Sequence, residues 1–263
     1  MQLLMCPPDY YGIEYEINPW MNRSRRSDLQ LANEQWSALR RVLQERCAID
    51  IHVIDAEPGL PDMVFTANAG LVWQNKFIVS NFRHEVRRRE AVHFAAWFRH
   101  QGFEIVHLPQ EYFFEGEGDL LKCGDSWLAG YHIRSDIGAH QKIAEIIEQQ
   151  ILSLELASEW FYHLDTCFCP LSDKQALFYA PAFDPYACRV IENHIPHLIA
   201  VSPAEAARFA CNAIVVDKCV VMNDGCPQVH EQLEGIGFTV FETPLSEFLK
   251  AGGSAKCLAL IIQ

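Results

Sequence analysis

Three residue types that cooperate in nucleophilic catalysis occur in two short segments of this chain. Cys257 ends the segment GGSAKC, and His163 and Asp165 lie two residues apart in FYHLDTCF, so that on a strand they would face the same way. A cysteine is a nucleophile only as the thiolate, and a nearby imidazole helps to supply that state. A histidine that a carboxylate orients can act as a general acid and base.

Two further segments add acids and an amide. FFEGEGDLL interleaves Glu115, Glu117 and Asp119 with glycines, and PDMVFTAN is a strand-like run that ends in Asn68. A carboxylate drawn into apolar surroundings needs a partner such as a bound cation. Thiol, imidazole and several acids together suit attack on a guanidinium carbon, whereas amide hydrolysis would require an oxyanion hole.

Each of these segments also has an interpretation without chemistry. Glu-Gly-Glu-Gly-Asp is typical of a solvated loop, a lone histidine is often bonded to a carbonyl in the core, and Asn68 could be an ordinary turn residue. Cys257 is one of ten cysteines, any of which could be a small buried hydrophobe. His163, Cys167 and Cys169 could also hold zinc, although C-x-C lacks the C-x2-C spacing of zinc knuckles.

A repeated unit of strands and one helix must position these residues. AGLVWQNKFIVSNF predicts two strands joined at Gln74-Asn75, and a helix over residues 85–100 and the strand EIVHLP follow. NAIVVDKCVVMN, CPQVHEQLEGI and TVFETP repeat that order, and three weaker copies have helices over residues 28–47, 137–150 and 185–194. Five such units could bury their apolar faces against one another by closing into a ring around a central channel.

Composition and charge narrow the function classes. The chain of 263 residues is half hydrophobic and carries a formal net charge of −13, which argues against nucleic-acid or anionic-membrane partners and is compatible with a small cationic substrate. No apolar run approaches about 18 residues, and no basic leader precedes an apolar core. We therefore expect a cytoplasmic protein with reduced thiols and one domain over residues 1–263. Nucleotide-binding motifs are absent from the sequence.

Over nearly its whole length the chain resembles the guanidine-modifying enzymes of the pentein fold, an α/β fold that forms a five-bladed β/α propeller. HLDT is similar to the family's His-x-Asp motif, FEGEGD to its Glu-Gly-Gly-Asp loop with one extra residue, and GGSAKC to its nucleophile segment. The resemblance implies that Cys257 is the nucleophile and that Glu115 orients His163 as the general acid and base. It also implies that Asp165 contacts the substrate and that Asp119 binds the guanidinium or supports the site.

The same resemblance implies the remaining substrate contacts. Arg83 in SNFRHEVRRRE and Arg134 in YHIRSD fall where deiminases place arginines that hold the substrate carboxylate, and Asn22 in NPWMN is a further expected contact. Deiminases read Phe-Thr-Arg-Asp where this chain reads FTAN, so the neutral amide of Asn68 replaces an aspartate that clamps the guanidinium. CPPDYYGIEYEINPWMN and FTANAGLV look most similar to the arginine dihydrolases, which convert arginine to ornithine, CO2 and two ammonia molecules.

The implied reaction needs no cofactor and no metal, because the guanidinium supplies its own electrophile. The Cys257 thiolate attacks, His163 protonates the departing ammonia, and water releases citrulline from a covalent S-alkylthiouronium; a second round on retained citrulline gives ornithine. A neutral amide at Asn68 could tolerate both guanidinium and urea. Open alternatives are a dimethylarginine dimethylaminohydrolase or single-step arginine deiminase, an amidinotransferase, and a non-catalytic arginine sensor. Homo-oligomer formation also stays open.

Overall fold

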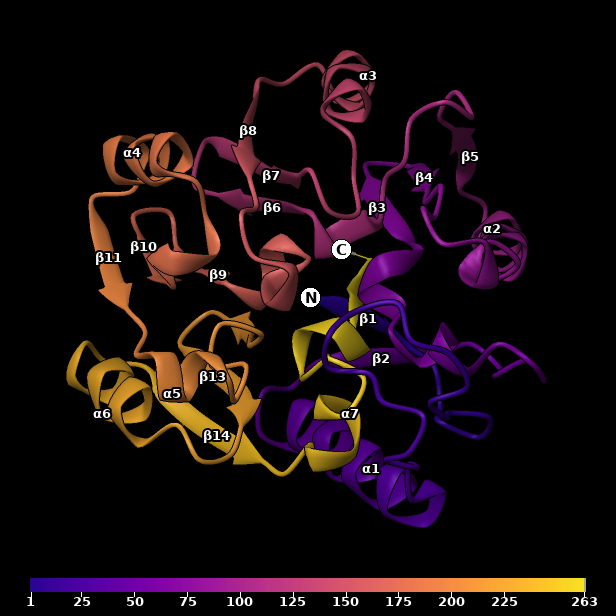
Figure 1. Cartoon of the computed structure of the whole chain (residues 1–263), viewed down its shortest axis with the longest axis horizontal. Helices are drawn as coiled ribbons and strands as arrows, with labels where there is room; N and C mark the ends of the chain where they lie inside the picture. Colours follow the sequence, from indigo (N-terminus) through magenta and orange to yellow (C-terminus); the bar gives the residue numbers. More distant parts are fainter. Residues whose placement is uncertain (263) are drawn as a thin grey trace.

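The computed structural model describes residues 1–262, and their strands form five three-stranded sheets around a common centre (Figure 1). In each sheet one neighbouring pair of strands is antiparallel and the other is parallel. The four sheets that follow the first along the chain have the predicted order of hairpin, helix and parallel strand. The fold is therefore a mixed α/β fold built from repeated units.

Each of the second to fifth sheets forms, together with one helix, a unit that is continuous in sequence. The second unit contains β3 (Gly70–Trp73), β4 (Lys76–Val79), α2 (Glu90–His100) and β5 (Glu104–His107). The third contains β6 (Leu120–Cys123), β7 (Ser126–Tyr131), α3 (Ile137–Ile147) and β8 (Ile151–Glu155). The fourth contains β9 (Phe168–Ser172), β10 (Gln175–Phe178), α4 (Pro185–His194) and β11 (His197–Ala200). The fifth contains β12 (Ile214–Val216), β13 (Cys219–Asn223), α6 (Pro227–Gly235) and β14 (Thr239–Thr243).

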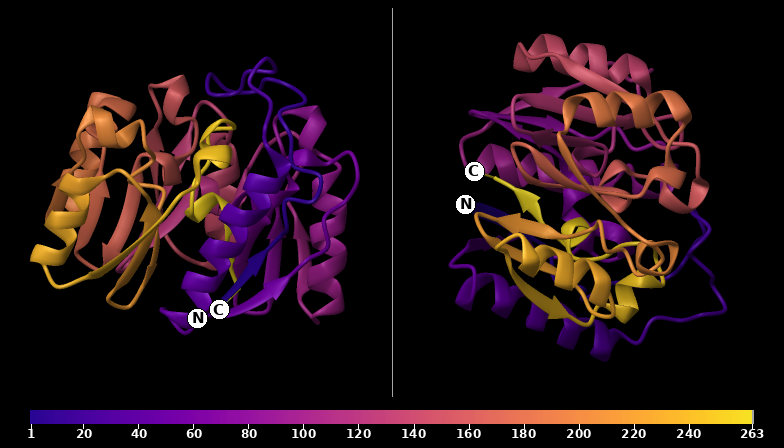
Figure 2. Two further views of the ribbon diagram at one scale, coloured as in Figure 1. Left: turned by 90° about the horizontal axis from the view of Figure 1, so that it is seen from below. Right: turned by 90° about the vertical axis from the view of Figure 1, so that its left-hand side faces the viewer.

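The first sheet joins the two ends of the chain. Its strands are β1 (Gln2–Met5), β2 (Asp50–Val53) and β15 (Leu260–Ile261), and β1 is the middle one. The helix α1 (Leu29–Glu45) lies between β1 and β2 in sequence. β15 pairs antiparallel with β1, so both termini lie at the same end of the molecule (Figure 2). The long segment between β1 and α1 lies at the opposite end (Figure 2). A short helix, α7 (Ser246–Leu249), follows β14 and packs on α1.

Three predicted helices begin or end differently in the structure. The helix expected over residues 85–100 is divided, because residues 85–87 form a separate 3-10 turn before α2 begins. The helix expected over residues 137–150 ends at Ile147, and Glu148 after it has a left-handed backbone with φ of 55°. The helix expected over 28–47 is slightly shorter, and Asp28 caps it by accepting a hydrogen bond from the Leu31 amide.

The apolar side chains of the sheets pack against their helices. In the second sheet the Phe77 ring stacks on Phe98 of α2 with ring centroids 3.7 Å apart, and both side chains are fully buried. A Cβ atom at Gly70 would collide with the Ile78 carbonyl and the Phe77 ring, so only glycine fits at the start of β3. None of the helices formed by residues 1–262 combines the length and apolar character needed to cross a bilayer.

Candidate active site

Four short 3-10 turns carry the predicted site residues to the centre of the molecule. Each turn directly precedes a strand of a different sheet, where the chain enters that sheet from the centre. The turns are η2 (Thr66–Ala69) before β3, η4 (Gly116–Gly118) before β6, η6 (Leu164–Thr166) before β9 and η8 (Lys256–Leu258) before β15. The repeated architecture therefore places four different segments at equivalent positions.

The strand expectation for two of these segments is wrong. His163 precedes the turn η6 and Asp165 lies within it, while Asn68 lies in η2. Threonine side chains contribute to both turns: the Thr166 hydroxyl donates locally to the His163 carbonyl at 2.6 Å, and the Thr66 hydroxyl donates to the distant Leu4 carbonyl at 2.9 Å. Such bonds satisfy backbone groups that a sheet would otherwise pair.

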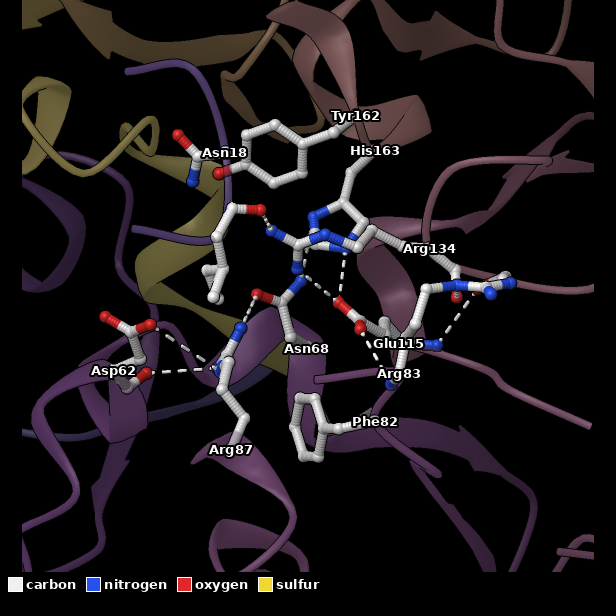
Figure 3. A network of polar contacts seen from close by, with 12 residues as sticks. Asn18, Asp62, Asn68, Phe82, Arg83, Arg87, Glu115, Arg134, Tyr162 and His163 are labelled. Carbon is white, nitrogen blue, oxygen red and sulfur yellow. Dashed lines mark hydrogen bonds and ion pairs between the residues drawn. The ribbon is translucent and has the colours of Figure 1, made fainter. Parts of the chain in front are cut away.

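His163 is held between an acid and an amide (Figure 3). Its Nε2 lies 2.8 Å from Oε2 of Glu115, and the same oxygen accepts a hydrogen bond from Nη1 of Arg134 at 2.9 Å. Because an ionised carboxylate only accepts, Nε2 carries the proton and Nδ1 keeps its lone pair. Nδ1 faces Nδ2 of Asn68 at 3.5 Å.

Burial and charge set the protonation states of this pair. Burial lowers the pKa of His163 to about 4, although the Glu115 carboxylate opposes that shift. Burial alone would raise the pKa of Glu115, but the Arg134 guanidinium and the hydrogen bond from His163 hold it well below its usual range. Near neutral pH the site therefore contains a carboxylate and a neutral imidazole that can accept a proton on Nδ1.

Cys257 and Asp165 form a second pair. The Cys257 thiol donates to Oδ2 of Asp165 at 3.5 Å, and Oδ1 of Asp165 is buried without a hydrogen-bond partner among the described residues. Burial raises the pKa of Cys257 well above its usual value, and burial raises that of Asp165 to about 7 against the effect of Lys256. The resting cysteine is therefore a neutral thiol beside an acid that lacks one partner.

Asn212, which sequence reasoning missed, fixes the backbone on both sides of this pair. Its Oδ1 accepts hydrogen bonds from the amides of Ser254 and Cys257, each at 3.1 Å, and its Nδ2 donates to the Asp165 carbonyl at 3.1 Å. Asn212 lies just before β12, which is the position in the fifth sheet that corresponds to the turns of the other four. The repeat therefore offered a signal for this residue.

A small cavity of about 10 Å³ lies between Asn68, Arg134 and Cys257 and the segment that joins β1 to α1. That segment covers the cavity: Nη2 of Arg134 donates to the Ile17 carbonyl at 3.0 Å, and the Asn18 amide donates to the Ala251 carbonyl at 3.0 Å. The lining consists of Ile17, Asn18, Met21, Asp62, Phe65, Asn68, Arg87, Arg134, Tyr162, Ala251, Gly253 and Cys257. The cavity is too small for an amino acid, so a substrate that binds there must widen it.

Two predicted substrate contacts lie outside this cavity. Arg83 forms an ion pair with Asp136, and its Nε donates to the Arg134 carbonyl at 3.1 Å, so its guanidinium is directed away from the cavity. Asn22 is exposed, and its Oδ1 accepts from the Ser24 amide at 2.8 Å, which makes it a turn residue. That both contact the substrate stays a prediction; Asn18 and Arg87 line the small cavity, whereas Arg83 and Asn22 do not.

The three acids of FFEGEGDLL point in three directions. Glu115 meets His163, whereas Glu117 pairs with Nζ of Lys256 at 2.8 Å. Asp119 accepts from the Ser135 hydroxyl at 2.6 Å and from the Leu164 amide at 3.2 Å. It therefore supports the turn that follows His163 and does not line the cavity, so of its two expected roles the structure favours support.

A much larger cavity, of about 960 Å³, opens at the end of the molecule where the termini lie. Its walls are mainly apolar and include Trp73, Trp127 and Phe168. The Glu117–Lys256 ion pair and Asp165 also line it, and none of these three residues lines the small cavity.

No cluster of three or more His, Cys, Asp or Glu side chains within residues 1–262 is arranged to hold a metal ion. The structure therefore does not assemble His163, Cys167 and Cys169 as a ligand set. The Cys167 thiol lies within 3.7 Å of the His163 carbonyl, and the Cys169 thiol lies 3.6 Å from the Ala213 carbonyl.

Arg87 is a further residue of the site that sequence reasoning missed. Arg87 is only 3% exposed and donates to Oδ1 of Asn68 at 2.9 Å and to both carboxylate oxygens of Glu90 at 2.9 and 2.7 Å. It lies in the run RRRE, where its spacing to Glu90 resembles that of an ordinary exposed helical pair.

Known proteins share this fold and much of this sequence. The family model described as N,N dimethylarginine dimethylhydrolase, eukaryotic, matches residues 13–262. The chain is 48% identical over 265 residues to the bifunctional arginine dihydrolase/ornithine cyclodeaminase ArgZ of Synechocystis sp., covering 99% of this chain and 37% of that protein. It is 37% identical over 259 residues to the N(G),N(G)-dimethylarginine dimethylaminohydrolase of Mycobacterium tuberculosis, covering 98% of this chain and 85% of that protein.

Two solved structures of the N-terminal domain of ArgZ are also similar. One is a mutant bound to substrate and the other is a mutant covalently bound to a reaction intermediate. Both have a TM-score of 0.96 and 45% sequence identity, and they cover 100% of this chain and 98% and 97% of those chains. The chain thus spans 37% of the length of the full ArgZ protein.

Proposed function

Since the chain belongs to the N,N dimethylarginine dimethylhydrolase family, we propose that it is a cysteine-dependent arginine dihydrolase, which converts arginine to ornithine, CO2 and two ammonia molecules. The observation that carries this proposal is the neutral Asn68 amide beside His163, in the cavity that Cys257 also lines. A carboxylate there would favour a cation, whereas an amide is compatible with both a guanidinium and a neutral urea. The identity to a named arginine dihydrolase supports the same activity.

The substrate is held by groups that lack partners in the free protein. The unpartnered Oδ1 of Asp165, whose Oδ2 accepts from the Cys257 thiol, accepts a guanidinium N–H. The Nε of Arg134, which is also buried and unpartnered among the described residues and lines the small cavity, binds the substrate carboxylate. The positive charge of the guanidinium stabilises the thiolate form of Cys257, whose pKa burial has raised. Nucleophile activation is therefore coupled to substrate binding.

In the first hydrolysis, a bond forms between Sγ of Cys257 and the guanidinium carbon. Nδ1 of His163 takes the thiol proton of Cys257 as that bond forms and then donates it to the leaving nitrogen; the C–N bond breaks and ammonia departs, which leaves an S-alkylthiouronium. His163 Nδ1 then takes a proton from water as that water attacks the same carbon. Breaking the C–S bond restores the thiol and gives citrulline. The covalent intermediate reported for the relative supports this route.

The second hydrolysis repeats these steps on citrulline. Cys257 attacks the ureido carbon, the second ammonia departs, and water releases a carbamate from the resulting thiocarbamate. Loss of CO2 from the carbamate gives ornithine, so the balance is arginine and two waters to ornithine, CO2 and two ammonia molecules. None of the steps requires an added oxidant, reductant or cofactor.

Product analysis tests this function. Purified protein is incubated with arginine, and ammonia, citrulline and ornithine are measured over time, with Cys257→Ser as the inactive control. We expect ornithine and ammonia in a ratio of one to two. Citrulline without ornithine would replace the proposal with a single-step deiminase. Faster release of dimethylamine from dimethylarginine would favour the activity named by the family model and by the relative from Mycobacterium tuberculosis.

The five sheets of the described residues support a finer description of the fold. We propose that they form a five-bladed β/α propeller and that residues 1–263 make up one catalytic domain, in which every sheet contributes to one site.

A further inference from the structure

The ion pair of Glu117 and Lys256 joins the turn before β6 to the turn that carries the nucleophile. Nζ of Lys256 lies 2.8 Å from Oε2 of Glu117, and the two side chains are 10% and 8% exposed. The same ammonium donates to the Ala259 carbonyl at 3.1 Å, and the same carboxylate oxygen accepts from the Ile261 amide at 3.1 Å. Lys256 directly precedes Cys257 in η8, so a fixed positive charge lies beside the segment that reacts.

This pair also lies near Asp165, because all three side chains line the large cavity. Burial raises the pKa of Asp165 to about 7; Lys256 is the strongest of the groups that oppose this rise, and Glu117 adds to it. Lys256 forms its ion pair with Glu117, so it acts on Asp165 through its electric field. Water and salt screen a buried charge only weakly. The charge state of Asp165 near neutral pH therefore depends on the pair.

Other titratable groups also surround Asp165. They are Cys257 on η8, Asp119 after η4, and Tyr162, Cys167 and Cys169 around η6. Burial raises the pKa of each of these groups, so the thiols and the phenol carry no charge near neutral pH. Lys256 is the only cation in this set.

We propose that Lys256 is a positioning residue that keeps Asp165 ionised for the cationic substrate, and that Glu117 holds Lys256 in place while it limits this effect. An ionised Asp165 can pair with a guanidinium, whereas a neutral carboxyl group cannot. The inference rests on the proposed function, since it concerns the same site and takes arginine as the substrate. It implies opposite effects for the two members of one ion pair, which a purely structural role would not produce.

The test is the pH profile of kcat/KM for arginine consumption. This parameter reports groups of the free enzyme, and it should rise with pH through the pKa of Asp165, which is about 7. Lys256→Met removes the positive charge, so the inflection should move up by at least about 0.5 pH unit, and kcat/KM below it should fall about threefold and recover at higher pH. Glu117→Gln removes the negative charge, so the inflection should move down.

Lys256→Arg and Lys122→Met are the matched controls. Arginine keeps the positive charge, so the inflection should stay near its wild-type position. Lys122 lines the same cavity but is exposed, so solvent screens its charge and its loss should leave the profile unchanged. Any result other than opposite shifts in the stated directions for Lys256→Met and Glu117→Gln would overturn the proposal. A wild-type profile without an inflection near pH 7 would overturn it as well.

A double variant covers the case in which Lys256→Met does not fold. That single change leaves the buried Glu117 carboxylate without its partner, which destabilises the protein. If circular dichroism shows no fold, Lys256→Met/Glu117→Gln replaces it. Its inflection should still lie above the wild-type value, because Lys256 affects Asp165 more than Glu117 does; a value at or below that of the wild type would overturn the proposal. Arginine consumption without ornithine in the wild type would instead refute the dihydrolase function and leave the shift measurable.

Discussion

The thiol of Cys257 lies 3.5 Å from Oδ2 of Asp165, and the other oxygen of that carboxyl group is buried without a partner among the described residues. Burial raises the pKa of both groups, which disfavours the thiolate of Cys257 and the carboxylate of Asp165 in the free protein. A guanidinium placed against Asp165 would supply the missing positive charge and stabilise the thiolate. In this arrangement Cys257 is a protonated thiol in the free protein, and the bound substrate favours the nucleophilic thiolate.

Cys257→Ser should abolish turnover while leaving the fold intact. A serine hydroxyl is far less ionised near neutral pH, so we expect a loss of at least about 10³-fold in kcat. Ornithine and ammonia release would be measured, together with circular dichroism. Cys188→Ser is the matched control, because Cys188 lies on α4 away from the cavity and its replacement should leave activity unchanged. Wild-type rates in a folded Cys257→Ser protein would remove this residue from the mechanism.

The pH dependence of kcat/KM for arginine should follow Asp165. This parameter reports groups of the free enzyme, and burial raises the pKa of Asp165 to about 7. Below that pH the carboxyl group is neutral and cannot pair with the cationic substrate, so kcat/KM should rise with pH and level off above about 7. His163, with a pKa lowered to about 4, stays neutral over this range. In Asp165→Asn the inflection near pH 7 should vanish and kcat/KM should be low throughout; an unchanged inflection would assign it to another group.

His163→Ala should reduce kcat by roughly 10² to 10⁴, the usual effect of losing a general acid and base. The same imidazole activates water, so the variant should also retain covalent adduct. Intact-mass spectrometry after mixing with arginine would detect that adduct. Glu115→Gln should reduce activity less, because the amide oxygen can still accept the proton of Nε2 but lacks the charge that stabilises an imidazolium. Undiminished turnover in His163→Ala would refute the role.

The repeated unit was predictable because its signals are local. Strand, turn, strand, helix and glycine follow one another within residues 70–107, and the structure has β3, β4, α2 and β5 there. The closing contact was not predictable in this way, because β15 pairs with β1 from the other end of the chain. No local pattern states which distant strand a two-residue strand will join.

The same distinction applies to the site. HLDT and GGSAKC pointed to His163 and Cys257 because they resemble the family's His-x-Asp motif and its nucleophile segment. Arg87 could not be told from Arg88 and Arg89, because its burial depends on Asp62 and Asn68, which lie far from it in sequence. The ion pair of Arg83 with Asp136 could not be predicted for a similar reason, since that acid belongs to the next unit along the chain.

Activity should survive treatment with EDTA. The proposed electrophile already carries a positive charge, so the carbon needs no Lewis acid before Cys257 attacks. Ornithine production would be measured before and after chelation and dialysis, together with the metal content of the protein. Loss of activity on removal of a stoichiometric metal, and its return when that metal is restored, would contradict the proposed mechanism.

Asn68→Asp should shift the product from ornithine toward citrulline. An aspartate would pair with Arg87 through one oxygen and turn the other toward His163, where the wild-type amide has an N–H. That oxygen accepts, so it attracts the guanidinium of arginine and repels the ureido oxygen of citrulline. The first hydrolysis should continue, while citrulline leaves before the second and less ammonia is formed per arginine consumed. Asn75→Asp, in the exposed turn between β3 and β4, is the matched control and should preserve the wild-type ratio. An unchanged ratio of ornithine to citrulline in an active, folded Asn68→Asp protein would show that the charge at this position does not decide between one hydrolysis and two.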